Sequence, residues 1–239
     1  MLDKMKSIRE DIEKGTIFRH RTAEGTRPDL RVVKFENDML AVKDFNGSSS
    51  LFKHIIGPIL IRREYGALQK LIGVKGIPQL KFKIDKCAIA MEHIDHKTLS
   101  MFPEDAVGNE FYAKLAKVVE NIHSRGVAHC DLRSRGNVLV GENGEPYVVD
   151  FAACVYLGRG INPFTKWLFN QFVEADKNAV IRLKSKFSPG HLTEDEKAEI
   201  SHPMPLEKQA RAIGGFVRNV VRNLSDSKRT EKQSSISKQ

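Results

Sequence analysis

A β-hairpin predicted at residues 138–149 determines where the polar residues beside it lie. Its apolar strands, Val138–Val140 and Tyr147–Val149, flank the turn Glu-Asn-Gly. An Asn-Gly pair between apolar segments is a strong hairpin signal. Asn137 directly precedes the first strand and Asp150 directly follows the second, so strand pairing brings an amide oxygen close to a carboxylate. The pattern therefore predicts a polar site at the open end of the hairpin.

The segment before the hairpin places His129, Cys130 and Asp131 side by side. Such a cluster is compatible with a metal site, a cysteine nucleophile or a loop that handles phosphate. No further ligands follow at zinc spacing. A nucleophilic Cys130 would need a base and an electropositive pocket, so a small loop-packing residue is the favoured interpretation. We assign His129 no chemical role.

The oxygen atoms of Asn137 and Asp150 suit Mg²⁺, which proteins commonly hold through one or two oxygen ligands together with phosphate and water. Asp131 lies on the same loop, where it can accept a proton from an attacking hydroxyl. Phosphoryl transfer needs these parts: metal ligands, a base and cations that offset charge on the phosphoryl oxygens. The loop and the hairpin therefore indicate a phosphate-handling site.

A lysine for the phosphates is expected from the first part of the chain. Lys43 lies in the middle of the strand sequence AVKDF, between apolar neighbours that predict partial burial. A buried ammonium group needs an anion. Glu64, on a helix that Pro58 opens, is polar beside an apolar face and is the leading candidate for its partner.

The chain divides into a strand-rich first part and a mostly helical second part. The first part is expected to contain an amphipathic helix at 1–14, strands at 30–35, 39–45, 80–84 and 87–91, and a helix from Pro58 to about Gly73. The second part is expected to contain helices at 111–125, 163–174, 176–187 and 205–223, and one that begins with a capping box at Thr193. Residues 225–239 have almost no apolar content and are expected to be disordered.

Composition limits the class of protein. Hydrophobic residues make up 41% of the chain and charged residues 29%, which is typical of a soluble globular protein. No apolar run approaches the roughly 20 residues that a membrane span needs, and the charged start lacks the apolar core of a secretory signal. Three cysteines without a C-x-x-C pair fit a reducing cytoplasm. The net charge of +9 favours an anionic partner.

Five motifs, in this order, resemble those of the protein-kinase-like superfamily. AVKDF resembles the strand that carries the ATP-phosphate lysine, and Glu64 resembles its helix partner. AMEHI is similar to the hinge that holds adenine through backbone groups. HCDLRSRGN resembles the catalytic loop H-x-D-x-x-x-x-N, and VVDFAA resembles the D-F-G metal site. The resemblance covers roughly residues 16–160.

The resemblance implies a two-lobed α+β fold that binds ATP and Mg²⁺ between the lobes. The implied divisions are a strand-rich lobe at 1–92, a helical lobe at 93–224 and a tail at 225–239. By the same resemblance the site residues take the following roles: Lys43 binds the α- and β-phosphates, Glu64 orients Lys43, Glu92 and Ile94 flank adenine, Asp131 is the base, Arg133 approaches the γ-phosphate, and Asn137 and Asp150 hold Mg²⁺.

The chain departs from the family pattern at four points. Asn137 follows Asp131 by six residues where the pattern has five, which implies a bulge around residues 135–136. Ala152 replaces the D-F-G glycine, no G-x-G-x-x-G precedes Lys43, and no A-P-E segment follows Asp150. With the short basic chain and the HCDL sequence, these departures most resemble small bacterial lipopolysaccharide kinases that act on Kdo or heptose. RIO-type atypical kinases and aminoglycoside phosphotransferases are the next most similar.

The expected activity is ATP-dependent phosphorylation of a hydroxyl group, with a lipopolysaccharide-core sugar ranked ahead of protein Ser or Thr. This ranking depends on cations expected over the helices at 163–187, which favour an anionic acceptor at a membrane surface: Lys166, Lys177, Arg182, Lys184 and Lys186, against Glu174 and Asp176. The expected location is the cytoplasm, with peripheral contact at the inner face of the membrane. A pseudokinase scaffold and a nucleic-acid-binding module are the alternatives; nucleic acid ranks last.

Overall fold

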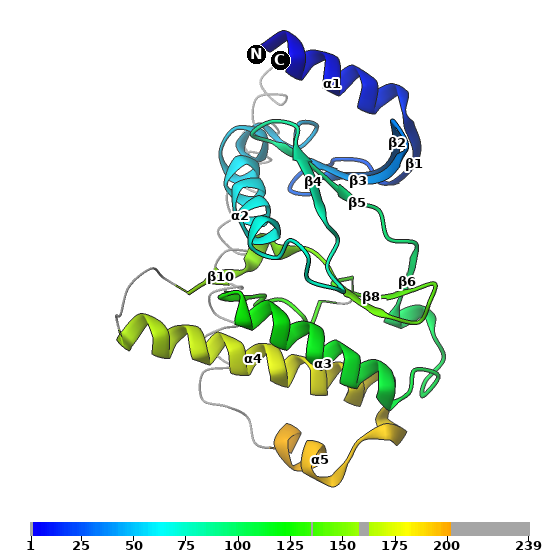
Figure 1. Ribbon diagram of the computed structural model, residues 1–239, viewed down its shortest axis with the longest axis vertical. Coiled ribbons are helices and arrows are strands. Elements are labelled where there is room, and N and C mark those ends of the chain that lie inside the picture. The colour runs from blue at the N-terminus through cyan, green and yellow to red at the C-terminus, as the bar shows by residue number, and fades with distance from the viewer. Residues whose placement is uncertain (1, 135, 158–162, 202–239) are drawn as a thin grey trace, which may run out of the picture.

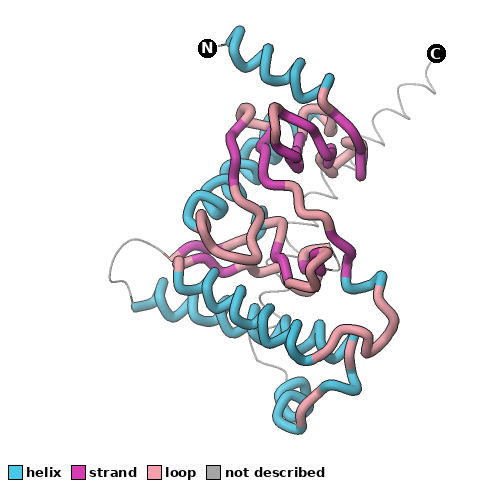
Figure 2. The backbone as a smooth tube through the Cα atoms, turned by 45° about the vertical axis from the view of Figure 1, so that its right-hand side comes forward, coloured by secondary structure: helices cyan, strands magenta, loops and turns pink. Residues whose placement is uncertain are grey.

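The computed structural model describes residues 2–134, 136–157 and 163–201 (Figure 1). Its strand-rich part contains α1 (Leu2–Lys14), β1 (Thr16–Arg21), β2 (Asp29–Phe35), β3 (Asp38–Asp44), α2 (Gly57–Lys70), β4 (Leu80–Lys83) and β5 (Ala88–Glu92). Its helical part contains β6 (His96–Thr98), α3 (Asn109–Ser124), β7 (Val127–Ala128), β8 (Val138–Gly141), β9 (Pro146–Val148), β10 (Val155–Tyr156), α4 (Pro163–Phe187) and α5 (Glu194–Ser201). The expected change from a strand-rich to a helical part is confirmed, and Figure 2 shows the larger sheet in the upper half and the long helices in the lower half.

The strand-rich part is built on a five-stranded antiparallel sheet with the order β1-β2-β3-β5-β4. The four expected strands correspond to β2, β3, β4 and β5. Strand β1 was not predicted, because five of its six residues are exposed and Ile17 and Phe18 are adjacent instead of alternating. An exposed edge strand carries little of the period-2 pattern on which strand prediction depends.

Helix α1 covers one face of the sheet, as the expected amphipathic helix at 1–14. Ile12 is 1% exposed and packs in one cluster with Val33, Leu40 and Val42 from β2 and β3. The alternation of side chains along a strand then sends the intervening residues to the opposite face. Lys43 is therefore directed away from α1, toward α2 and the helical part.

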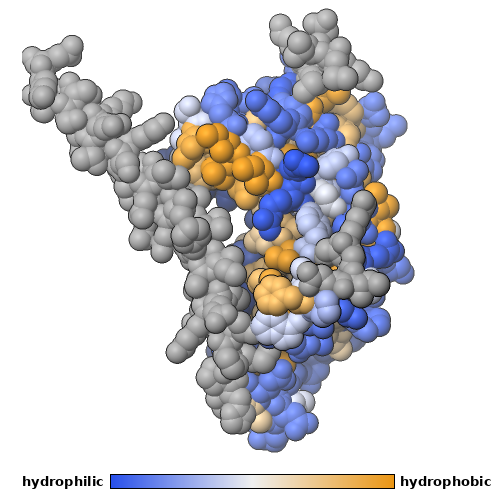
Figure 3. Space-filling view, turned by 90° about the vertical axis from the view of Figure 1, so that its left-hand side faces the viewer, coloured by the Kyte–Doolittle hydropathy of each residue, from blue (hydrophilic) through white to orange (hydrophobic). Residues whose placement is uncertain are grey.

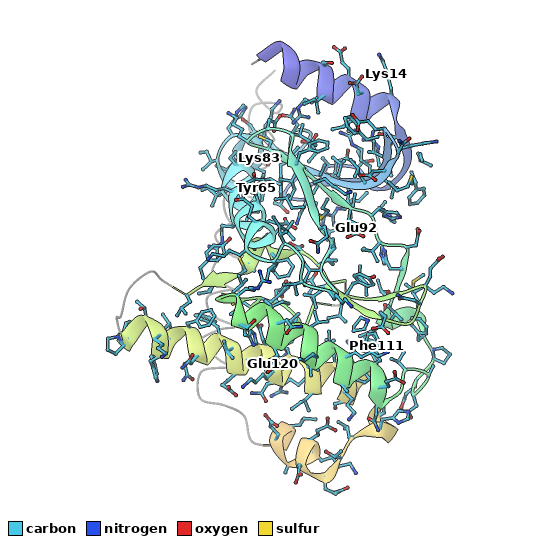
Figure 4. The ribbon with its side chains drawn as sticks, in the orientation of Figure 1. Lys14, Tyr65, Lys83, Glu92, Phe111 and Glu120 are labelled. Atoms are coloured by element: carbon cyan, nitrogen blue, oxygen red, sulfur yellow. The ribbon has the colours of Figure 1, made fainter. Side chains whose placement is uncertain are left out.

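Helix α2 is packed tightly against the end of β3. A π-helical turn at Phe52–Ile56 leads into it, and Gly57 lies where an added Cβ would approach within 2.7 Å of the Cβ atom of Phe45. Pro58 occupies the first turn, as expected. At the other side of α2, the Nζ atom of Lys83 lies 5.5 Å from the centre of the Tyr65 ring (Figure 4). These contacts hold α2 beside the sheet and fix the orientation of its buried face.

The helical part has α3 and α4 side by side beneath the sheet (Figure 1). The two helices expected at 163–174 and 176–187 are wrong, because α4 is a single helix of 25 residues. No glycine or proline interrupts it after Pro163. The predicted break fell at Asp176, a residue typical of helix starts, but Asp176 is buried in the middle of α4.

The capping box at the start of α5 is confirmed. The amide of Glu196 donates to the Thr193 hydroxyl at 3.2 Å, and the amide of Thr193 donates to the Glu196 carboxylate at 2.8 Å. The helix expected at 205–223 and the tail at 225–239 lie outside the described residues. Among the helices in the described ranges, none has the length and apolar character needed to span a bilayer.

Candidate functional site

Lys43 is the centre of a buried ion cluster between the two parts of the molecule. Its Nζ atom lies 2.7 Å from Oε2 of Glu64 and 2.9 Å from Oδ1 of Asp150. Lys43 lies on β3, Glu64 lies on the buried face of α2, and Asp150 lies two residues after the end of β9. The structure thus brings together three residues that the sequence singled out, two of them 107 positions apart.

The electrostatics of this cluster favour the charged forms of Lys43 and Asp150. Burial disfavours the Lys43 ammonium group, but Asp150 and Glu64 outweigh this effect and raise the pKa of Lys43 above its usual range. The charge of Lys43 lowers the pKa of Asp150. Burial raises the pKa of Glu64, against the opposing charge of Lys43. One ammonium group shared by two carboxylates leaves an excess of negative charge, which a further cation can balance.

Asp150 is held in an unusual backbone conformation. Its φ of 66° and ψ of 73° are left-handed, a region that Asp tolerates better than most residues. Its carboxylate accepts a hydrogen bond from the Ala152 amide at 3.4 Å, and Phe151 beside it is fully buried against the His129 ring. The Asp150 side chain is nevertheless 47% exposed. The residue is therefore fixed at its backbone while its carboxylate faces solvent.

The loop that precedes the hairpin is held by His129. The buried imidazole donates through Nε2 to the carbonyl of Val149 at 3.0 Å, and its Nδ1 accepts the amide of Asp131 at 3.2 Å. A carbonyl can only accept and an amide N–H can only donate, so these two bonds require the neutral tautomer that is protonated on Nε2. His129 has the structural position that the sequence analysis expected, and it joins the loop to the residue before Asp150.

Asp131 and Asn137 are in direct contact on this loop. The Asn137 side-chain amide donates to the Asp131 carbonyl at 2.9 Å and to its carboxylate Oδ2 at 3.2 Å. The Ser134 amide donates to the Asp131 carbonyl at 3.2 Å, and the Asn137 amide donates to the Ser134 carbonyl at 3.1 Å. Residue 135, where the bulge was expected, is not among the described residues. Arg133 is exposed beside Asp131.

The surroundings of Cys130 disfavour a reactive thiolate. Burial raises the pKa of its thiol well above the usual range, so the thiolate form is scarce. The thiol instead points toward the carbonyl of Ala128 at 3.5 Å. Cys130 therefore fills space in the loop, as the sequence analysis favoured.

Asp176 is the site residue that the sequence analysis missed. Its carboxylate accepts the amide of His129 at 2.6 Å, the amide of Cys130 at 2.8 Å and the Nε2 group of His123 at 3.0 Å. Cys130 has a φ of 67°, which is strained for a residue other than glycine, asparagine or aspartate. Asp176 thus offsets this strain and fixes the loop from below. Its position among the apolar residues Phe169, Val180 and Leu183 of α4 was the available signal.

The cationic surface expected over 163–187 is smaller in the structure. Lys184 is 5% exposed and bonds to Glu196 of α5 at 2.7 and 2.9 Å. Lys177 pairs with Glu174 at 2.7 Å. Lys166 and Lys186 are exposed. Because a buried, paired lysine presents little charge to a surface, Lys184 adds little to the cationic surface on which the expected ranking of acceptors depended.

Of the expected hinge residues, Glu92 lies where β5 leaves the sheet (Figure 4), and Ile94 follows it by two positions. The Glu92 amide donates to the carbonyl of Gln79 at 2.8 Å, and the His93 amide donates to the carbonyl of Met39 at 3.1 Å. The Ile94 amide has no acceptor within the described part of the chain. A cavity of about 290 Å³ is lined by these three hinge residues and by the turn between β8 and β9.

The oxygen ligands present fit a metal ion that is shared with a substrate. Among the described residues, no group of three His, Cys, Asp or Glu side chains is placed to hold a metal ion alone. Asp150 has a solvent-facing carboxylate, and Asn137 lies at the start of the strand that pairs beside it. One carboxylate and one amide oxygen, completed by phosphate and water, is an arrangement usual for Mg²⁺.

No protein-family model matches the chain, and no curated protein matches it in sequence. Solved structures do match. The Rio2 kinase from Chaetomium thermophilum aligns with a TM-score of 0.56 and 14% identity over 95% of this chain and 77% of that one. A second structure of that kinase, an ADP/Mg²⁺-phosphoaspartate complex, aligns with the same TM-score and identity over 95% of this chain and 75% of that one.

The chain has a protein-kinase-like fold. The expected α+β architecture, with a strand-rich N-lobe and a helical C-lobe, is therefore confirmed. The Lys43–Glu64–Asp150 cluster lies between these lobes, and the loop with Asp131 and Asn137 belongs to the C-lobe.

Proposed function

We propose that the protein is an ATP- and Mg²⁺-dependent phosphotransferase that acts on a hydroxyl group. The observation that carries this proposal is the Lys43–Glu64–Asp150 cluster between the lobes, with contacts of 2.7 and 2.9 Å. A structural ion pair alone would not require the solvent-facing carboxylate of Asp150 or the adjoining Asp131–Asn137 contact. These groups are the parts that phosphoryl transfer needs.

In the proposed reaction, Lys43 binds the α- and β-phosphates of ATP and Glu64 keeps it oriented. Asp131 accepts the proton of the acceptor hydroxyl while the hydroxyl oxygen forms a bond to the γ-phosphorus. The bond from the γ-phosphorus to the β–γ bridging oxygen breaks, and ADP leaves. Arg133 offsets charge on the transferred group. Asn137 and Asp150 would hold Mg²⁺, which supplies positive charge to the phosphates when bound. Glu92 and Ile94 flank the adenine.

Two acceptor classes remain compatible with this site. The preference for a lipopolysaccharide-core sugar depended on surface cations of α4, and the burial of Lys184 and the pairing of Lys177 remove much of that support. A protein Ser or Thr, as in a RIO-like kinase, fits equally well. Peripheral contact with a membrane stays a prediction that accompanies the sugar acceptor.

The test is transfer of labelled γ-phosphate from ATP to purified lipopolysaccharide and, in parallel, to a generic protein acceptor. Asp131→Asn should lower the transfer rate by roughly 10²–10⁴-fold, because it removes the proposed base. Asp150→Asn should abolish Mg²⁺-dependent turnover. Label on protein alone favours the RIO-like acceptor. A wild-type protein that never binds Mg·ATP would show instead that the chain is a pseudokinase scaffold.

A further inference from the structure

A second concave surface lies outside the cleft between the lobes, on the outer side of α2. This groove has a volume of about 710 Å³. Arg62, Arg63 and Lys70 line it from α2 together with Ile59, and Tyr156 of β10 forms the opposite wall. The face of the molecule that carries α2 shows an apolar patch beside a hydrophilic band (Figure 3). The proposed reaction uses none of these side chains.

The bottom of the groove depends on a glycine. Gly66 lies in the middle of α2, and a Cβ atom added there would come within 3.0 Å of the Tyr156 hydroxyl oxygen. That hydroxyl donates to the carbonyl of Arg63. A glycine inside a helix costs roughly 0.5–1 kcal/mol relative to alanine. The absence of a side chain here is what lets the Tyr156 ring approach the helix and keeps the hollow open.

The charge of the groove is of one sign. Among the described residues, its lining contains three cations and no carboxylate. Lys70 lies 5.9 Å from the centre of the Tyr156 ring, and Arg63 donates to the carbonyls of Ala153 and Cys154. Within the described ranges, no Asp or Glu forms an ion pair with Arg62, Arg63 or Lys70. Positive charge that is gathered in a hollow attracts an anionic partner.

One end of the groove is apolar. Ile59, which lines this end, is 52% exposed, and Ile55, four residues before it and just outside the lining, is 53% exposed. They continue the same helical stripe that carries Arg62 and Gly66, since these positions are spaced by three or four residues. A ligand that fits the whole surface therefore combines a bulky apolar group with negative charge.

We propose that the α2 groove is a docking site for an acidic peptide segment that carries a bulky apolar side chain. The shape favours a peptide over the other anionic partners of a basic protein. A flat bilayer surface does not fill a hollow of about 710 Å³, and a nucleic-acid backbone offers no apolar group for Ile55 and Ile59. Carboxylates on a chain that also carries Phe or Leu match both halves of the groove.

Occupation of the groove would also act on the cleft. Arg63 and Tyr156 join α2 to the segment just after Asp150, and the residue beside Arg63 is Glu64, the partner of Lys43. A bound segment that contacts both walls favours the arrangement in which α2 and residues 153–156 are together. This consequence rests on the proposed function, whereas the docking itself does not.

The test measures binding directly, with the full chain and a fluorescein-labelled peptide of glutamates around one central phenylalanine. Binding is measured by fluorescence anisotropy at about 0.15 M salt, because salt at this concentration screens electrostatic attraction beyond roughly 8 Å. The double variant Arg62→Glu/Lys70→Glu should weaken binding about tenfold, which corresponds to about 1.4 kcal/mol. Replacing the peptide's phenylalanine by alanine, or Ile59 of the protein by asparagine, should also weaken it severalfold, as expected for an apolar anchor.

The matched control is Lys117→Glu/Lys197→Glu, which makes the same change in net charge at two exposed lysines of α3 and α5. It should change peptide affinity less than about twofold, because the charges lie away from the groove. Equal losses in both double variants would overturn the proposal in favour of non-specific attraction. The proposal would also be overturned if the protein bound phosphatidylglycerol vesicles or an RNA oligonucleotide more tightly than the peptide, and if Arg62→Glu/Lys70→Glu weakened that binding while the control variant did not. ATP turnover of Arg62→Glu/Lys70→Glu is measured separately. If turnover is normal and the peptide does not bind specifically, the docking proposal fails and the proposed function stands.

Discussion

Lys43 and Asp44 are neighbours on β3, yet their side chains organise two charge networks on opposite faces of the sheet. Lys43 contacts Glu64 and Asp150 on the side of the helical lobe. Asp44 contacts Arg9 of α1 at 2.7 Å and Arg31 of β2 at 3.5 Å on the other side. Both networks are largely buried, so burial and ion pairing do not distinguish them.

The two networks differ in what they connect and in where they are open. The Asp44 network joins α1 to strands of the same sheet, and Arg9 extends it to Asp85 at 2.7 Å. The Lys43 network joins three elements from two lobes, and the Asp150 side chain is 47% exposed. In a network that is enclosed by its own partners, loss of one charge leaves another buried charge without its partner and destabilises the fold. In the Lys43 network, the solvent-facing Asp150 carboxylate lies between the lobes, where it can contact a bound cation or substrate. We therefore assign the proposed activity to this network.

Among the variants that compare the two networks, loss of the Lys43 charge should have the largest effect. Lys43→Met removes the cation proposed to contact the ATP phosphates, and it should lower ATP turnover by about 10²–10³-fold, as is typical when one preorganised electrostatic contact is lost. The measurement is steady-state ADP release at saturating Mg·ATP. Turnover within a fewfold of wild type would show that the Lys43 network is structural, like the Asp44 network.

Replacement of the Asp176 carboxylate should have the second-largest effect, because this carboxylate holds the loop that carries Asp131. Asp176→Asn puts an NH₂ group against amides that can only donate, so it should lower the free energy of unfolding by about 3 kcal/mol. Urea denaturation measures this loss. The control is Glu174→Gln, on the same helix but 45% exposed and paired with Lys177, which should change stability by less than about 0.5 kcal/mol.

The Lys43 network was predictable from sequence and the Asp44 network was not, for a physical reason. Lysine in an apolar strand requires a buried anion, so Lys43 pointed to Glu64 without knowledge of the fold. Asp44, Arg31 and Asp29 are charged residues near a strand end, where solvent exposure is the ordinary expectation. In the structure they are 5–6% exposed and pair with Arg9 and Glu13 of α1 and with Arg19 of β1, contacts that no local pattern shows.

Asp176 was misjudged for a related reason. Helix prediction treats aspartate as a helix-start residue because its side chain competes for backbone hydrogen bonds. In α4 the amides of His129 and Cys130, more than 45 positions away, satisfy that carboxylate instead. Such a tertiary contact leaves no local pattern except an acid on an apolar stripe. The hairpin and its flanking residues were predictable because they depend on local pairing.

Removal of one charge from the Asp44 network should reduce stability and leave the activity intact. In Asp44→Asn the side-chain oxygen can still accept the Asn46 amide, Arg9 keeps Asp85, and Arg31 keeps Glu13 and Asp29. The expected loss is about 1–2 kcal/mol in unfolding free energy, with ATP turnover within about twofold of wild type. A large loss of turnover without a loss of stability would contradict the division between the two networks.

The smallest effect concerns a third group of ionisable residues, at the edge of the same sheet. His20 of β1 lies with its ring centre 6.2 Å from that of His96 and 6.5 Å from that of His93, near Phe18, and Asp95 pairs with His93 at 3.1 Å. Burial, and then the charges of His96 and His93, lower the pKa of His20. The folded state therefore binds fewer protons at this residue than the unfolded state does.

A histidine whose folded pKa lies below its unfolded value of about 6.5 leaves stability intact above that pH and reduces it as the pH falls toward the folded pKa. His20→Gln should therefore reduce the loss of stability between about pH 7 and pH 5. Because His20 is exposed to solvent, screening limits the change to a few tenths of a kcal/mol, about 1–2 °C in Tm. Thermal unfolding at both pH values measures it, with His54→Gln, an exposed histidine of the π-helical turn, as the control. The interpretation is contradicted if His20→Gln increases the loss of Tm between the two pH values, or if it has the same effect as His54→Gln. Either result would mean that repulsion among the three histidine rings does not affect stability, and that of the three charged groups only the Lys43 and Asp44 networks do.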